Sequence, residues 1–134
     1  MRVMLDTNTI VSGVVFQGSE RHLLHAIFAQ GHTLVLSEYV FQETKRVLTR
    51  KFPGKEFALE AWLQLTEVER VPLPQAERAK EAQGLIRDPK DAAILATVIL
   101  AKPDIFITGD RDFHTPEVAA ITKVLTTKDA LLLL

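Results

Sequence analysis

Acidic side chains follow directly after two apolar segments of this sequence. Asp110 and Asp112 come just after DIFIT at residues 104–108, and Asp6 comes just after the apolar residues 3–5. Carboxylates that lie close together repel one another unless a positive charge sits between them. These aspartates are therefore either loop residues that face water, since Gly-Asp is a common turn pair, or parts of a site that holds a cation.

A second acidic pair, Asp88 and Asp91, lies in RDPKDAAIL. Asp88 followed by Pro89 is a strong helix start, and Asp91 falls in the first turn, where the helix dipole favours an anion. This is a complete structural explanation of Asp91. The helix that follows is apolar almost all round, however, so it must be buried. We expect its N-terminus to point at the edge of a sheet rather than into open solvent.

Glu43 is the acidic candidate on a helix predicted over residues 38–51. At about 100° per residue, it falls on the border of the apolar stripe of that helix. One interpretation is a surface pair with Arg46, which stabilises a helix by only a few tenths of a kcal/mol. The other is a carboxylate held at the rim of the core, with Arg46 and Arg50 nearby to hold a phosphate.

Asp6, in LDTN, also has two interpretations. Asp, Thr and Asn commonly form a turn and cap the segment that follows. Alternatively, Asp6 is a metal-binding carboxylate whose oxygens are held in place by Asn8 or Ser12. Thr108, just before Asp110, can donate its hydroxyl to a phosphate or to a bound water.

The elements that position these residues alternate between short apolar strands and helices. Strands followed by helices imply parallel pairing, and unbroken apolar runs are typical of buried parallel strands. We therefore predict a three-layer α/β/α sandwich with a central parallel sheet of about four to five strands. The strands are predicted at 2–6, 33–37, 104–108 and 123–127, the helices at 20–30, 38–51, 54–68, 75–84, 89–101 and 128–134, and VPLP at 71–74 is predicted to be extended.

In such a sheet, ligands bind outside the C-terminal ends of the strands. Under this arrangement Asp6, Glu43, Asp91 and Asp110 can all converge on one crevice. Several carboxylates within a few ångströms could not all stay ionised without a cation, and an all-oxygen site suits Mg²⁺ or Mn²⁺. One or two such ions can activate a water and stabilise the leaving oxygen of a phosphodiester.

Composition limits the class of protein. The 134 residues, 47% hydrophobic and 25% charged, predict one globular domain over residues 1–134. Cysteine is absent, which excludes disulfides and thiolate zinc sites. The N-terminus does not resemble a signal peptide, and the longest apolar run is about half of what spans a bilayer, so we expect a cytoplasmic protein without a membrane partner. A net charge of −1 argues against a basic nucleic-acid coat.

LDTN, the glutamate of the second predicted helix, RDPKDAAIL and IFITGDRDF together resemble PIN domains, which are small metal-dependent ribonucleases. The spacing is most similar to the VapC-like group, single-domain toxins of toxin–antitoxin pairs. The resemblance implies a homodimer or higher homo-oligomer and an antitoxin partner whose peptide enters the active-site groove. It also implies a metal site with four acidic residues, which fall on Asp6, Glu43, Asp91 and Asp110.

Two positions remain open within this resemblance. Asp112 is a possible extra ligand or a supporting group. Glu38 is another acidic candidate on the same helix as Glu43, but it lies opposite the apolar stripe. Candidates for phosphate contacts with an RNA substrate are Arg46, Arg50, Lys51 and Arg111, while Asn8, Ser12 and Thr108 would support the ligands.

The sequence thus predicts a Mg²⁺- or Mn²⁺-dependent endoribonuclease that acts on single-stranded or structured RNA, as the toxin of a toxin–antitoxin pair. A second hypothesis is a catalytically silent PIN fold that binds RNA or a protein partner. The intact acidic set argues against it, because binding an anion requires no cluster of carboxylates. A phosphoacceptor domain ranks last, since TLVLS ends in Ser37 where such a domain needs an aspartate.

Overall fold

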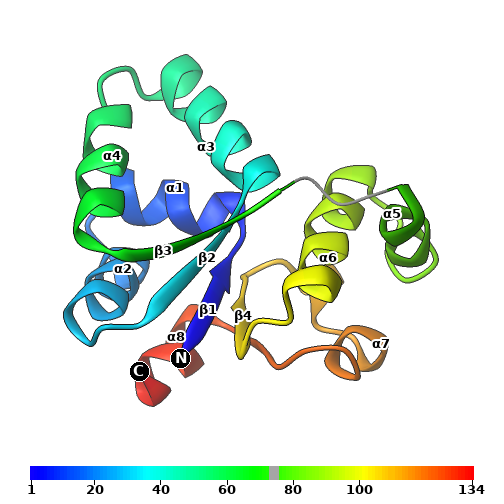
Figure 1. The fold of residues 1–134 in the computed structure, drawn as a ribbon. Helices are drawn as coiled ribbons and strands as arrows, with labels where there is room; N and C mark the ends of the chain where they lie inside the picture. Colours follow the sequence, from blue (N-terminus) through cyan, green and yellow to red (C-terminus); the bar gives the residue numbers. More distant parts are fainter. Residues whose placement is uncertain (73–75) are drawn as a thin grey trace.

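The computed structural model describes residues 1–72 and 76–134, and the side chains of all of these except residues 76–78. Its centre is a parallel sheet with the strand order β3-β2-β1-β4-β5 (Figure 1). An α/β fold with a parallel sheet was predicted and is confirmed. The strands are β1 (Arg2–Leu5), β2 (Thr33–Ser37), β3 (Glu67–Val71), β4 (Ile105–Ile107) and β5 (Val124–Leu125).

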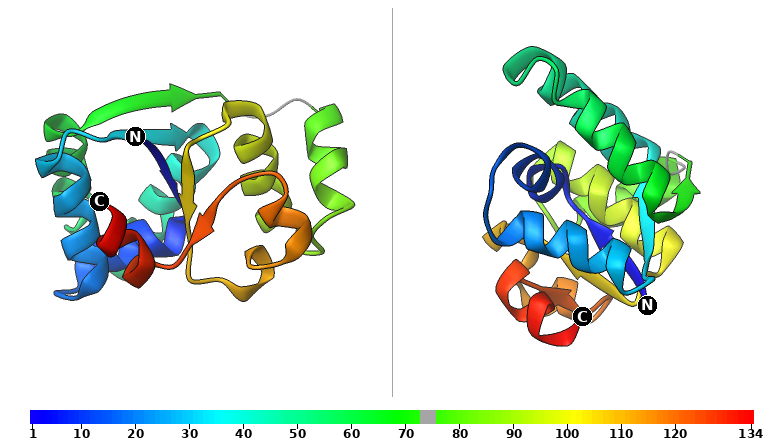
Figure 2. Two further views of the ribbon diagram at one scale, coloured as in Figure 1. Left: turned by 90° about the horizontal axis from the view of Figure 1, so that it is seen from below. Right: turned by 90° about the vertical axis from the view of Figure 1, so that its left-hand side faces the viewer.

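Helices cover both faces of this sheet (Figure 2). One face carries α1 (Thr7–Val15), α2 (Ser19–Ala29), α3 (Glu38–Lys51), α4 (Glu56–Leu65) and α8 (Thr127–Leu133). The other face carries α5 (Ala76–Gln83), α6 (Pro89–Ala101) and α7 (Pro116–Ala119), and a short 3₁₀ helix, η1 (Arg111–Phe113), follows β4. Within the described residues, no helix has the length and apolarity that a membrane crossing requires.

The strand order explains why the helices divide between two faces. From β1 the chain moves outward to β2 and β3, and it then returns across the sheet to β4 and β5 on the other side of β1. Right-handed crossovers in opposite directions place their helices on opposite faces. Between β1 and β4 the order reverses, and a crevice opens at such a point beyond the C-terminal strand ends. Leu5 pairs with Ile107 there, so Asp6 and Thr108 lie side by side.

Helix α1 was not predicted, because its sequence is rich in β-branched residues that have low helix propensity. Burial of its apolar side chains stabilises this helix despite the low helix propensity of its residues. Ile10, Val11 and Val14 are buried in the hydrophobic core, and α1 packs against α2 and α3. Gly13 faces α2 so closely that a Cβ there would lie 2.6 Å from Leu24 Cδ1. The signal that was available is Asp6, which caps the helix through Thr9.

Strand β3 corrects the helix predicted over residues 54–68. The helix ends at Leu65, and residues 67 and 68 already belong to the strand. This edge strand pairs with β2 along its whole length, and its side chains are mostly exposed apart from Val71. A polar edge strand has no apolar alternation from which to recognise it. The extended segment predicted at 71–74 and the first residue of the helix predicted at 75–84 fall partly on residues 73–75, outside the described residues.

Other elements match the sequence closely. Residues 33–37 and 89–101 form the strand and the helix predicted for them, and α3 spans 38–51 as expected. Gly31, with φ 69°, ends α2 in the left-handed conformation that favours glycine. The last strand was predicted too long, over 123–127, because Thr126 caps α8 and turns the chain into a helix.

Candidate metal centre

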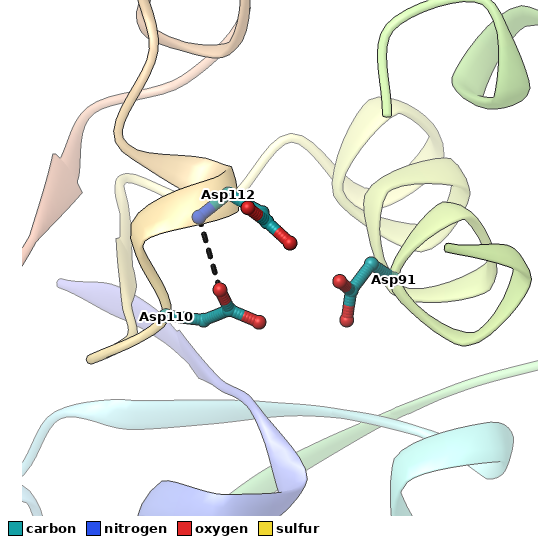
Figure 3. A group of neighbouring side chains, drawn as sticks. All are labelled: Asp91, Asp110 and Asp112. Atoms are coloured by element: carbon teal, nitrogen blue, oxygen red, sulfur yellow. Dashed lines mark hydrogen bonds between the residues drawn. The ribbon is translucent and has the colours of Figure 1, made fainter. Parts of the chain in front are cut away.

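Three aspartates meet at the crevice beside β1 and β4. Asp91 extends from the first turn of α6, and Asp110 and Asp112 face it from η1 (Figure 3). One carboxylate oxygen from each residue lies within 4.8 Å of the others. Carboxylate oxygens gathered in this way are the ligands that hard divalent cations prefer. This set of donors, which we call the aspartate cluster, therefore fits a metal ion.

Local backbone preferences place each member of the cluster. Asp88 caps α6 by accepting a hydrogen bond from Lys90 N at 2.8 Å, and Pro89 follows at the first helical position. The helix start predicted from RDP is confirmed, and it carries Asp91 to the crevice. Asp110 caps η1 by accepting a hydrogen bond from Asp112 N at 2.9 Å. The cap turns the chain so that both carboxylates remain on the side of Asp91 (Figure 3).

Asp6 is tied to the cluster through Thr108. It is only 6% exposed. Its Oδ1 accepts a hydrogen bond from Thr9 N at 2.9 Å, and its Oδ2 accepts one from the Thr108 hydroxyl. The same Thr108 oxygen accepts a hydrogen bond from Asp110 N at 3.1 Å. Asp6 thus caps α1, as its structural interpretation predicted, and it also lies in the wall of the crevice.

Burial and repulsion within this crevice both raise the pKa of Asp91. Its pKa is raised to about 6, first by burial and then by repulsion from other carboxylates, which are those of Asp110, Asp88, Asp112 and Asp6. A carboxylate in such surroundings favours a proton or a metal ion as a neighbour. A bound cation would therefore reduce the repulsion between the carboxylates of the aspartate cluster.

The cluster opens into a cleft of about 420 Å³, which we call the main cleft. Its walls combine acidic residues with cations from α3 and from the start of α6. Besides the aspartate cluster, the walls include Asp6, Asn8, Glu43, Arg46, Arg50, Lys51, Asp88 and Lys90.

Glu43 reaches the main cleft, whereas Glu38 does not. Glu43 Oε2 accepts a hydrogen bond from the Tyr39 hydroxyl at 3.1 Å. Burial and the negative charge of Glu43 raise the pKa of Tyr39 to about 12, so this phenol keeps its proton. Glu38 instead forms a salt bridge with Arg70 at 3.2 Å, at the edge of the sheet. The surface pair between Glu43 and Arg46 that the sequence allowed is absent from the described part of the chain.

Two predicted site residues line neighbouring clefts instead. Ser12 lines a cleft of about 370 Å³, which it shares with Asp6, Asn8 and Asp110. Arg111 lines a different cleft of about 480 Å³, which it shares with Asp112. The predicted acidic residues thus meet at one place, but the supporting and cationic residues are spread over three adjoining clefts.

Lys90 and Glu20 were not predicted as site residues. Lys90 lies between Asp88 and Asp91, and its position in the first turn of a helix aimed at the crevice is a signal that the sequence carries. Glu20 lines the same cleft as Ser12. It follows the short loop between α1 and α2, and because α1 was not predicted, its proximity to Asp6 could not be inferred.

A parallel α/β sheet with a carboxylate cluster at the reversal of its strand order defines a class of small metal-site domains. The family to which this chain belongs is the PIN domain family, whose model matches residues 2–112. The resemblance carried by LDTN, RDPKD and TGDRDF is thereby confirmed.

Solved structures support the same fold. The chain is similar to a chain of VapBC2 from Rickettsia felis, crystallised with a DNA fragment from its promoter, with a TM-score of 0.68, 19% identity, and coverage of 94% of this chain and 98% of that one. It is equally similar to a chain of FitAcB from Neisseria gonorrhoeae, with a TM-score of 0.67, 19% identity and the same coverage. Mycobacterium tuberculosis VapC20, a toxin that cleaves the sarcin-ricin loop, has a TM-score of 0.59 and 19% identity over 84% of this chain and 92% of its own. A search of curated protein sequences found no match.

Proposed function

We propose that this protein is a metal-dependent endoribonuclease that hydrolyses phosphodiester bonds in single-stranded or structured RNA. The observation that carries the proposal is the aspartate cluster in the wall of a cleft that is also lined by cations. Carboxylates alone would repel a polyanion. A cluster of carboxylates that holds a metal ion, with cations beside it, is suited to bringing a phosphodiester to the metal.

The aspartate cluster would hold the ion, and the donor set favours Mg²⁺ or Mn²⁺. Asp6 and Glu43, in the walls of the same cleft, would complete the ligand set, with Glu43 alternatively orienting the attacking water. The bound ion would activate a water and neutralise charge on the leaving oxygen. Thr108 would keep Asp6 in position, and Asn8 and Ser12 would support the ligands from the neighbouring cleft.

The cations of the main cleft have a separate task, which is to hold the RNA backbone. Arg46, Arg50 and Lys51 come from α3, and Lys90 comes from α6. Phosphate contacts of this kind fix the position of the strand without reading its sequence. The affinity for RNA should therefore fall as the salt concentration rises.

We further propose that the protein is the toxin of a toxin–antitoxin pair and acts in the cytoplasm as a homodimer or higher homo-oligomer. VapBC2 and VapC20 are the relatives that suggest this role. An antitoxin protein would then be its partner and would block the active-site groove.

The proposal is tested by incubating a panel of RNAs with Mn²⁺, Mg²⁺ or EDTA. Wild type is compared with Asp110→Asn and Asp6→Asn. A matched control is Asp104→Asn, which precedes β4 at the opposite end of the sheet and can still accept the hydrogen bond from Arg2 N. Cutting that needs metal, persists in the control and is lost in both site variants is the expected result. A wild type that neither cuts nor binds Mn²⁺ would refute the enzyme and favour the alternative, a silent PIN fold that binds RNA or a protein.

A further inference from the structure

A second cleft adjoins the aspartate cluster at Asp112 and includes no residue of α3. It has a volume of about 480 Å³ and lies between two segments. One is residues 83–87, from the end of α5 into its connection to α6, and the other is the segment after β4 that contributes Arg111, Asp112 and Thr115. Arg87 and Arg111 are its two positive charges, and we call it the arginine cleft. Arg111 was predicted from the sequence as a candidate for phosphate contacts, but the proposed function assigns no role to Arg87 or to the cleft as a whole.

The backbone of each arginine is held beside a helix cap, whereas its guanidinium group is exposed and has no partner among the described residues. Arg87 precedes Asp88, the cap of α6, and Arg111 follows Asp110, the cap of η1. Both side chains are exposed, and neither guanidinium forms a salt bridge or hydrogen bond with the residues that the structure describes. Two guanidinium groups are thus available to an anion, each carried by the same turn that positions a member of the aspartate cluster.

Asp112 connects the two clefts, since it lines both of them. Cations therefore line both of the clefts that meet at Asp112, from α3 and α6 in the main cleft and from Arg87 and Arg111 in the arginine cleft. An RNA strand with a phosphodiester at the cluster must continue in both directions. The arginine cleft is where a strand that enters along α3 would leave.

We propose that the arginine cleft is a second phosphate subsite, in which Arg87 and Arg111 hold the RNA backbone beyond the bond that is cut. This inference rests on the proposed function and extends it. Arginine suits the task because its planar guanidinium can form two parallel hydrogen bonds to phosphate, which the single ammonium of lysine cannot. Both arginines are positioning residues, and neither touches the reacting atoms.

The subsite has a measurable consequence in the salt dependence of binding. For single-stranded nucleic acid, each neutralised phosphate contributes about 0.7 to the slope of log affinity against log salt. Arg87→Ala should therefore reduce the magnitude of this slope by about 0.7, and Arg87→Ala with Arg111→Ala by about 1.4. Arg87→Lys keeps the charge but loses the paired hydrogen bonds, so it should keep the slope and bind more weakly.

Binding is measured by the fluorescence anisotropy of a labelled unstructured RNA oligonucleotide at several salt concentrations. The Asp110→Asn background is used so that the RNA stays intact during titration. Lys128→Ala is the matched control, because it removes one positive charge from an exposed position on α8, outside the three clefts. Polyglutamate is titrated in parallel to distinguish RNA from an acidic peptide. Thermal unfolding verifies that each variant is folded.

The expected result is a reduced slope in the arginine variants and an unchanged slope in Lys128→Ala. If wild type cuts RNA but the arginine variants bind like Lys128→Ala, the subsite is refuted and the nuclease stands. If wild type does not cut but the slopes change as expected, the subsite stands and the nuclease fails. An equal loss of affinity for polyglutamate would overturn the subsite in favour of a site for an acidic peptide.

Discussion

Replacing Thr108 by valine tests whether the threonine hydroxyl holds the crevice together. The side chain is fully buried, and its hydroxyl donates a hydrogen bond to Asp6 and accepts one from Asp110 N. A hydrogen bond to a charged group contributes about 1.5–3 kcal/mol, and an ordinary one contributes about 0.5–1.5 kcal/mol. Valine has the same shape as threonine, and burial of its additional methyl group offsets part of the stability lost with these hydrogen bonds.

Thr108→Val is then expected to lower the free energy of unfolding by about 3 kcal/mol, since Asp6 Oδ2 also remains buried without its hydrogen-bond donor. For 134 residues, the entropy of unfolding is about 0.28 kcal/mol/K. A loss of about 3 kcal/mol should therefore lower the Tm by about 10 °C. Urea and thermal unfolding in EDTA measure this effect separately from any contribution of metal.

Thr44 is the matched control for this substitution. It is also buried, at 1% exposed, but its hydroxyl has no hydrogen-bond partner within the described part of the chain. Thr44→Val removes a buried hydroxyl that forms no hydrogen bond with the described residues, so the variant should be as stable as wild type or more stable by about 1 kcal/mol. If Thr108→Val and Thr44→Val have the same stability, the hydroxyl bridge between Asp6 and Asp110 does not hold the crevice.

Two further predictions follow from Asp91 and Gly13. Because the pKa of Asp91 is raised from 3.8 to about 6, the folded protein binds more protons than the unfolded chain between these pH values. Without metal, its free energy of unfolding should fall with rising pH there more steeply than that of Asp91→Asn, and parallel urea-unfolding curves would contradict the assignment. Gly13→Ala should lower the free energy of unfolding in urea by about 1–3 kcal/mol, because the added Cβ would lie 2.6 Å from Leu24 Cδ1. Gly18→Ala is the control, since a Cβ there meets nothing within 4 Å, and an equal loss of stability in both variants would refute this packing argument.

The parts of the fold that could be predicted are those with a strong local signal. The strand at 33–37 has a buried apolar run at residues 34–36, and α6 begins at Pro89 after the cap Asp88. What could not be predicted depends on distant neighbours. Helix α1 forms because its β-branched residues are buried in the core, where the helix packs against α2 and α3, and β3 forms because it pairs with the free edge of β2.

The candidate site follows the same division. Asp6, Asp91 and Asp110 could be singled out because each stands at a strand end or a helix start that the sequence marks, whereas Glu43 lies within α3 and was singled out only by its place at the border of the apolar stripe. The bridge from Asp6 through Thr108 to Asp110 depends on the register of β1 against β4, which no local pattern specifies. Likewise, the assignment of Arg111 to a different cleft from Arg46 depends on how η1 turns after β4.

The reversal of strand order also determines when the crevice can form. The residues made first contribute β1, β2 and β3, and with them Asp6, Glu43 and the cations of α3. The aspartate cluster comes entirely from residues 91–112, which must return across the sheet to pair with β1. Pairing between segments about a hundred residues apart is slow, because the loop entropy is lost before the contact stabilises the chain. A chain still being synthesised therefore has cations and no cluster, and the complete crevice is among the last features of the molecule to assemble.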